Sequence, residues 1–143
     1  MVGPSERLEA VFNKAVKDAK KLQHEYVTLE HILFAMLCEE EFVNILKGYG
    51  TDVDYIKKTV QNFLKDQCDD IKVENPKHKP KKTGTVERTL NRAFTQVLFN
   101  GRNEIEATDV LLSMLHEKKS HAAFYAEKAG IEKDKFSQYL QSE

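Results

Sequence analysis

Proline and glycine are scarce in this chain of 143 residues, which has three prolines and six glycines. Two cysteines, Cys38 and Cys68, are too few for a disulfide framework, so we expect reduced thiols, with a single bridge between them as the alternative. No apolar run approaches the ~20 residues that span a bilayer, and the first residues lack the apolar stretch of a signal peptide. These absences predict a cytoplasmic protein that does not bind membranes.

An excess of charge of one sign is also missing. The net charge is −1, so no overall field favours nucleic acid or an anionic membrane. Apolar residues make up 41% and charged residues 31%, as in ordinary globular proteins. The length suits one domain, residues 1–143, that needs neither metal nor disulfide to fold. We expect Met1–Pro4 to be disordered and assign them no role.

The apolar residues that are present recur at helical spacing. In the first half they predict a helix over residues 8–22 and a second helix, capped by Thr28, that is apolar on nearly every side and therefore central. A short third helix is expected to stop at residues 48–50. Thr51 and Asp54 have capping-box spacing and predict the start of a fourth helix.

The same order of helices recurs after a shift of about 78 to 80 residues. An internal repeat of four helices predicts a pseudo-twofold bundle whose halves share one core. The alignment pairs Asn13-Lys14-Ala15 with Asn91-Arg92-Ala93, His24-Glu25-Tyr26 with Asn103-Glu104-Ile105, Gly50 with Gly130, Thr28 with Ala107 and Glu30 with Asp109.

The predicted fold is therefore all-α, with eight helices in two pseudo-twofold four-helix repeats. Repeat one covers about residues 5–70 and repeat two about residues 85–142. Between them, residues 71–84 read IKVENPKHKPKKTG, with two prolines, five lysines and little to bury. This composition predicts an exposed, lysine-rich linker.

Two segments together resemble the Clp N-domain: EYVTLEHIL at residues 25–33 in the first repeat and GRNEI at residues 101–105 in the second. The resemblance covers the chain from about Ser5 to Ser142. Proteins of this family place the domain before AAA+ ATPase modules that unfold substrates into a peptidase. The resemblance thus implies a double Clp N repeat from a hexameric unfoldase that works with a ClpP-type peptidase.

Within the family the chain looks most like the ClpA type. The ClpC type usually has a glycine before T-E-H, where this chain has Val27, and the ClpA type has the Thr-apolar-Glu-His order of residues 28–31. The resemblance implies a docking domain for a ClpS-type adaptor, which presents substrates with destabilising N-terminal residues. It also implies a non-catalytic regulatory domain without a cofactor, because the ATPase modules are not in this chain.

Five residues are candidates for partner binding. Glu25 and Glu30 match acidic positions that the ClpA family uses toward its adaptor, where carboxylates can accept charge-assisted hydrogen bonds. For Glu30 the alternative is helix chemistry, since an acid in the first turn is stabilised by the helix dipole without any partner. Thr83, Thr85 and Arg88 match adaptor contacts at the entry to the fifth helix. The alternative there is a threonine cap beside a solvated arginine.

No catalytic or metal site is predicted. The chain lacks G-x-x-x-x-G-K-[ST], G-x-S-x-G and H-E-x-x-H motifs. His24, His31 and His78 do not form a dense ligand motif, although zinc needs three or four convergent ligands. We expect His31 to be a structural residue at a helix start and Cys38 to lie inside an apolar helix.

Two other functions stay open. A ClpC-like domain would recognise phosphoarginine through an acidic pocket in each repeat, with Glu30 and Asp109 as the paired acids. A basic arm formed by the linker lysines would bind nucleic acid, but no aromatic residue lies among them, and we favour a solvated linker.

Overall fold

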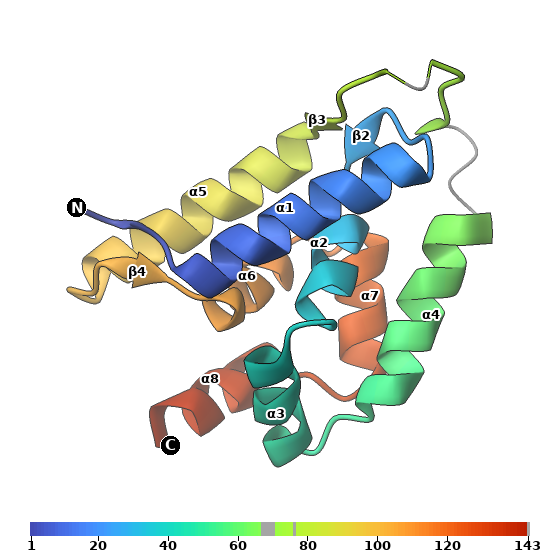
Figure 1. Ribbon diagram of the computed structural model, residues 1–143. Helices are drawn as coiled ribbons and strands as arrows, with labels where there is room; N and C mark the ends of the chain where they lie inside the picture. Colours follow the sequence, from blue (N-terminus) through green and yellow to red (C-terminus); the bar gives the residue numbers. More distant parts are fainter. Residues whose placement is uncertain (67–70, 76, 143) are drawn as a thin grey trace.

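The computed structural model describes residues 1–66, 71–75 and 77–142. Within these ranges the chain forms the eight predicted helices and four two-residue strands (Figure 1). The helices are α1 (Glu6–Lys21), α2 (Leu29–Met36), α3 (Glu40–Tyr49), α4 (Val53–Asp66), α5 (Gly84–Phe99), α6 (Ala107–Met114), α7 (His121–Lys128) and α8 (Lys133–Ser142). The strands are β1 (Gly3–Pro4), β2 (Tyr26–Val27), β3 (Lys81–Lys82) and β4 (Glu104–Ile105).

Helix α2 lies at the centre of the bundle, where it contacts α1, α4, α6 and α7. Seven of its eight residues are buried, so the prediction of a central second helix is confirmed. Leu33 of α2, Leu111 of α6 and Phe136 of α8 belong to one buried apolar cluster. The two repeats therefore share a core, as the internal repeat predicts. None of the helices in the described part of the chain combines the length and apolar character needed to cross a membrane.

Two parallel ribbons connect the halves: β1 pairs with β4, and β2 pairs with β3. The prediction that Met1–Pro4 is disordered is wrong, because the Gly3 N–H donates to the Asn103 carbonyl at 3.1 Å. Strands this short have no alternation of apolar and polar residues from which they could be predicted. Helix α1 runs between the ribbons over 16 residues, about 24 Å, so they lie at its opposite ends (Figure 1).

The expected linker lies against the first repeat. The Glu25 N–H donates to the Ile71 carbonyl at 2.6 Å, and the Val73 N–H donates to the Gln23 carbonyl at 2.7 Å. His78 Nε2 lies 2.8 Å from the His24 carbonyl oxygen. Lys81 and Lys82 of this segment form β3, so only the cap residue Thr83 separates α5 from a ribbon that is held to repeat one.

Two local predictions are wrong. Asp52, and not Thr51, caps α4, because Asp52 Oδ1 accepts the Tyr55 N–H at 3.1 Å. Cys38 does not lie inside a helix: α2 ends at Met36, and Cys38 is exposed. Cys68 lies outside the described residues.

The starts of α2 and α6 fix the register of the repeat. The Thr28 N–H donates to His31 Nδ1 at 2.9 Å, and the Glu106 N–H donates to Asp109 Oδ2 at 2.8 Å. These are matching capping boxes, so the register at this point is a shift of 78 residues. The counterpart of Thr28 is therefore Glu106, and not Ala107.

The same register corrects two further pairings. The counterpart of Glu30 is Thr108, and not Asp109, while the counterpart of His24 is Arg102, and not Asn103. Alignment of the GRNE segment alone pairs each residue of repeat one with the residue that follows its true counterpart in repeat two. The hydrogen bonds at the helix starts give the correct shift of 78 residues.

Candidate docking site

Helices α2, α5 and α7 begin around one hollow with a volume of about 200 Å³, which we call the central hollow. Its N-cap residues are Thr28, Thr83 and Ser120. Three helix starts meeting at one place direct the positive ends of three helix dipoles toward it. The residues that line the central hollow are Thr28, Leu29, Glu30, Thr83, Thr85, Ser120 and His121.

The β2–β3 ribbon brings two of these helix starts together. The Lys81 N–H donates to the Glu25 carbonyl at 3.0 Å, and the Thr83 N–H donates to the Val27 carbonyl at 3.3 Å. Thr83 Oγ1 then accepts the Val86 N–H at 3.1 Å and caps α5, so capping by Thr83 is confirmed. The strand pairing therefore places Thr83 beside the start of α2, although 55 positions of sequence separate it from Thr28.

Glu30 lies at the wall of the central hollow with an exposed fraction of only 8%. Its Oε2 atom accepts the Ala122 N–H at 2.7 Å, at the start of α7. A carboxylate in this position satisfies a helix N–H and is stabilised by the helix dipole. Glu30 lies in the first turn of its own helix α2, as the alternative of helix chemistry assumes, and it also accepts a hydrogen bond at the start of α7 in the other repeat.

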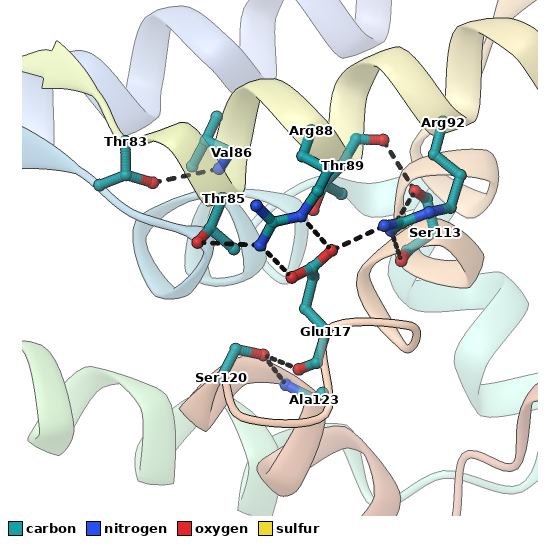
Figure 2. A network of polar contacts seen from close by, with 10 residues as sticks. All are labelled: Thr83, Thr85, Val86, Arg88, Thr89, Arg92, Ser113, Glu117, Ser120 and Ala123. Carbon is teal, nitrogen blue, oxygen red and sulfur yellow. Dashed lines mark hydrogen bonds and ion pairs between the residues drawn. The ribbon is translucent and has the colours of Figure 1, made fainter.

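Arg88 shares a carboxylate with Arg92, as Figure 2 shows. Arg88 Nε and Nη2 donate to the two oxygens of Glu117 at 3.1 and 2.6 Å, and Arg92 Nη2 donates to Glu117 Oε2 at 2.8 Å. The hydrogen bond from Arg88 is the largest cause that lowers the pKa of Glu117 to about 2, while partial burial opposes it. The Arg88 side chain stays 57% exposed, and its Nη2 also lies 3.4 Å from Thr85 Oγ1.

A second depression adjoins the first and shares Thr85 and Ser120 with it. We call it the basic hollow; its volume is about 420 Å³. The residues that line it are Thr85, Arg88, His116, Glu117, Lys118, Lys119 and Ser120. The residues from the α6–α7 loop were not predicted from the sequence. A cue was present in Ser120, which lies at N-cap spacing before the alanines of α7.

The structure brings four of the five predicted site residues together. Glu30, Thr83 and Thr85 line the central hollow, and Arg88 lines the basic hollow beside it. Glu25 lines neither of them. It is half-buried, and its backbone bonds both to Ile71 and to β3.

The pseudo-twofold counterpart of the central hollow lies where α1, α3 and α6 begin, and its volume is about 80 Å³. We call it the acidic hollow. Arg7 stands there in place of Thr85 and lies 2.9 Å from Glu41 and 3.5 Å from Glu106. The lining residues are Arg7, Glu39, Glu41, Phe42, Ile45, Glu106, Ala107 and Thr108. Since Thr108 replaces Glu30, the paired acids that the phosphoarginine hypothesis assumed are not equivalent residues.

The three histidines considered as metal ligands contact protein groups. His24 Nδ1 lies 2.8 Å from His31 Nε2, and the two nitrogens of His78 each lie 2.8 Å from a carbonyl oxygen, of Asn75 and of His24. Among residues 1–66, 71–75 and 77–142, no three His, Cys, Asp or Glu side chains converge in a way that could hold a metal ion.

Comparison with known proteins identifies the family of this chain. The Clp repeat (R) N-terminal domain family matches residues 4–142, and the chain belongs to this family. A ClpA homolog protein from Fuscovulum blasticum is 31% identical over 123 residues, which is 85% of this chain and 15% of that protein. The chain thus spans only a small part of the length of this relative.

Solved structures share the fold. The Hsp104 N-terminal domain from Candida albicans superposes with a TM-score of 0.79 at 15% identity, covering 95% of this chain and 87% of that one. The N-domain of ClpV from Vibrio cholerae superposes with a TM-score of 0.78 at 16% identity, covering 97% and 83%.

Proposed function

We propose that this chain is the docking domain of a ClpA-like unfoldase and binds a ClpS-type adaptor, and through it protein substrates, at the central and basic hollows. One observation supports this most directly: Glu30, Thr83 and Thr85, singled out from the resemblance alone, line one concave surface beside Arg88. Their side chains come from both repeats, so the folded domain is required to assemble them.

The candidate site residues contribute to docking in two ways: some contact the partner and others hold the surface in place. Thr85 and Arg88 offer a hydroxyl and an exposed guanidinium edge to a partner. Glu30 is nearly buried and bonded to Ala122, so its role is to hold the start of α7 in place. Glu25 would contact a partner that extends beyond the hollows toward the ribbon.

The domain would act by tethering. A bound adaptor keeps its substrate close to the ATPase pore, which raises the local substrate concentration without any chemistry by this domain. In a hexameric parent coupled to a ClpP-type peptidase, unfolding and cleavage would be done by the other modules. Peptide binding has a precedent in the fold: a ClpV N-domain that superposes with a TM-score of 0.73 has been solved in complex with a VipB peptide.

A steric block tests the proposed face. Thr85→Trp fills the position that the central and basic hollows share, and Thr95→Trp places the same side chain at an exposed position on the same helix. We expect calorimetric titration with a purified ClpS-type adaptor to show binding by the wild type and by Thr95→Trp. Binding should weaken about tenfold or more in Thr85→Trp.

Other results would correct the proposal in defined ways. Equal binding by both variants would exclude this face as the docking site. An absence of binding by the wild type would exclude the adaptor function and make free phosphoarginine the next ligand to titrate.

A further inference from the structure

The exposed charges around the two adjoining hollows are predominantly positive. Arg88, Lys118 and Lys119 line the basic hollow. Lys81 and Lys82 are exposed on β3, directly before the Thr83 cap. The hydroxyl caps of α2, α5 and α7 leave the positive ends of these helices facing the same region.

The acids of these hollows already have partners. Glu30 is bonded to the Ala122 N–H, and Glu117 is shared by Arg88 and Arg92. Glu87 is exposed in the first turn of α5 but lines neither hollow.

The lysines, in contrast, are largely available. Lys81, Lys82 and Lys119 form no ion pair with another residue that the structure describes. Lys118 pairs with Glu127 at 2.9 Å, but both side chains are well exposed, and such pairs contribute little to stability.

The acidic hollow has the opposite character. Glu39, Glu41 and Glu106 line it together with a single cation, Arg7. Glu39 accepts the N–H groups of Glu41 and Phe42, so a carboxylate of the chain itself already satisfies the start of α3. Two surfaces related by the pseudo-twofold axis therefore differ in charge as well as in volume.

Resting on the proposed docking function, we infer that the central and basic hollows bind an acidic segment of a protein partner. Its carboxylates lie against Thr85 and Arg88, with Lys118 and Lys119 at the rim. Charge-assisted hydrogen bonds from the guanidinium and attraction by the lysines supply the recognition. Because the acidic hollow repels the same segment, one partner binds per chain, although the fold is duplicated.

A short polyglutamate peptide is a suitable probe, because it presents carboxylates without any other side-chain chemistry. We expect its addition to ¹⁵N-labelled chain to shift the amide signals of Thr85, Arg88 and Ser120. The signals of Glu39 and Thr108 in the acidic hollow should not move. Raising the salt concentration should weaken the interaction, because exposed charges are screened.

Charge-reversal variants test whether the lysines of the basic hollow contribute to peptide binding. Lys118→Glu/Lys119→Glu should weaken peptide binding about tenfold. Lys47→Glu/Lys135→Glu changes the net charge equally on exposed residues of α3 and α8 that line neither hollow, and should leave peptide binding nearly unchanged. Equal effects of the two variants, shifts centred on the acidic hollow, or stronger perturbation of the same amides by a short DNA duplex would each overturn the inference.

The experiments distinguish failure of the proposed docking function from failure of the inference about an acidic segment. If polyglutamate binds as expected and the adaptor does not, the adaptor proposal fails and the acidic-segment site stands. If the adaptor binds and Lys118→Glu/Lys119→Glu does not weaken its binding, the docking function stands and the inference about charge fails.

Discussion

His24 Nδ1 lies 2.8 Å from His31 Nε2, and neither ring is exposed to solvent. The Thr28 N–H donates to His31 Nδ1, so the proton of a neutral His31 ring is on Nε2 and is donated to His24. A second proton on His31 would have no place in this arrangement, because both ring nitrogens of His31 are already engaged. At the equivalent place in repeat two, Arg102 and Asp109 form an ion pair at 2.6 Å.

The buried pair makes stability depend on pH. Burial, and secondly His24, lowers the pKa of His31 from 6.5 to about 3. Below about pH 6.5 the unfolded chain takes up a proton at His31 that the folded protein does not bind until about pH 3, so stability falls across this window. Between pH 7.5 and pH 5 we expect His31 to remove about 2 kcal/mol from the free energy of unfolding, measured in urea.

His31→Gln is the matched control for this prediction. Glutamine at the third helical position can accept the Thr28 N–H through its carbonyl oxygen and does not titrate. The variant should lose about 2 kcal/mol less than the wild type over the same pH interval. An unchanged pH dependence would assign the acid sensitivity to other groups.

Gly48 lies beneath the Tyr139 side chain in a contact between α3 and α8. A Cβ atom at this position would collide with the hydroxyl of Tyr139, whose ring packs against Tyr49 with centroids 5.5 Å apart. We expect Gly48→Ala to lower the free energy of unfolding by about 1–3 kcal/mol, although alanine is the better helix former. In a Tyr139→Phe background the collision is absent, and the same substitution should be neutral or stabilising.

Comparison of the two backgrounds by chemical unfolding measures the coupling directly. Equal effects of Gly48→Ala in both backgrounds would show that the Tyr139 hydroxyl is not the cause.

The helices were predictable because each has an apolar stripe and local end signals. Thr28 and Gly50 mark helix ends within a few residues of the sequence, and both predictions are confirmed. The ribbons were not predictable, because a strand such as Lys81–Lys82 is defined by a partner elsewhere in the chain. For the site, the resemblance indicated Thr85 and Arg88, but only the fold adds the lysines of the α6–α7 loop.

The one-residue error in the repeat alignment has a similar origin. A capping position can hold Thr28 in one repeat and Glu106 in the other, because in both repeats the backbone N–H at this position donates to the side chain three residues further on. An alignment based on residue identity cannot detect that these two positions are equivalent, whereas the hydrogen bonds at the helix starts show it.

We expect Glu30 to contribute to the stability of the folded domain, and a single substitution at this position tests that. Glu30→Ala leaves the Ala122 N–H buried without its acceptor, and we expect a loss of about 1–3 kcal/mol in the free energy of unfolding. Thr108→Ala, at the equivalent position of the acidic hollow, should change it by less than about 0.5 kcal/mol. Faster amide exchange at Ala122 in Glu30→Ala would locate the effect at the start of α7. Equal stability of the two variants would show that the Glu30–Ala122 bond contributes little.

The charge state of Glu117 reports on the arginines that hold it. The hydrogen bond from Arg88 is the largest cause of its low pKa of about 2, ahead of that from Arg92. Carboxyl titration of Glu117 by ¹³C NMR should therefore show a larger rise toward the ordinary value of 4.5 in Arg88→Ala than in Arg92→Ala.

Arg88→Lys should give an intermediate pKa for Glu117, since one ammonium group cannot donate to both carboxylate oxygens in the planar arrangement of a guanidinium. Because the folded-state pKa lies below the unfolded one, the stabilisation by this pair is complete above about pH 4.5 and is lost as the pH falls through about 2. Glu117 is therefore ionised at neutral pH and neutralises only one of its two arginines, so that a net positive charge remains for a partner's carboxylate. A rise that is larger in Arg92→Ala would show instead that Arg92 is the main partner of Glu117 and that Arg88 is the more available of the two.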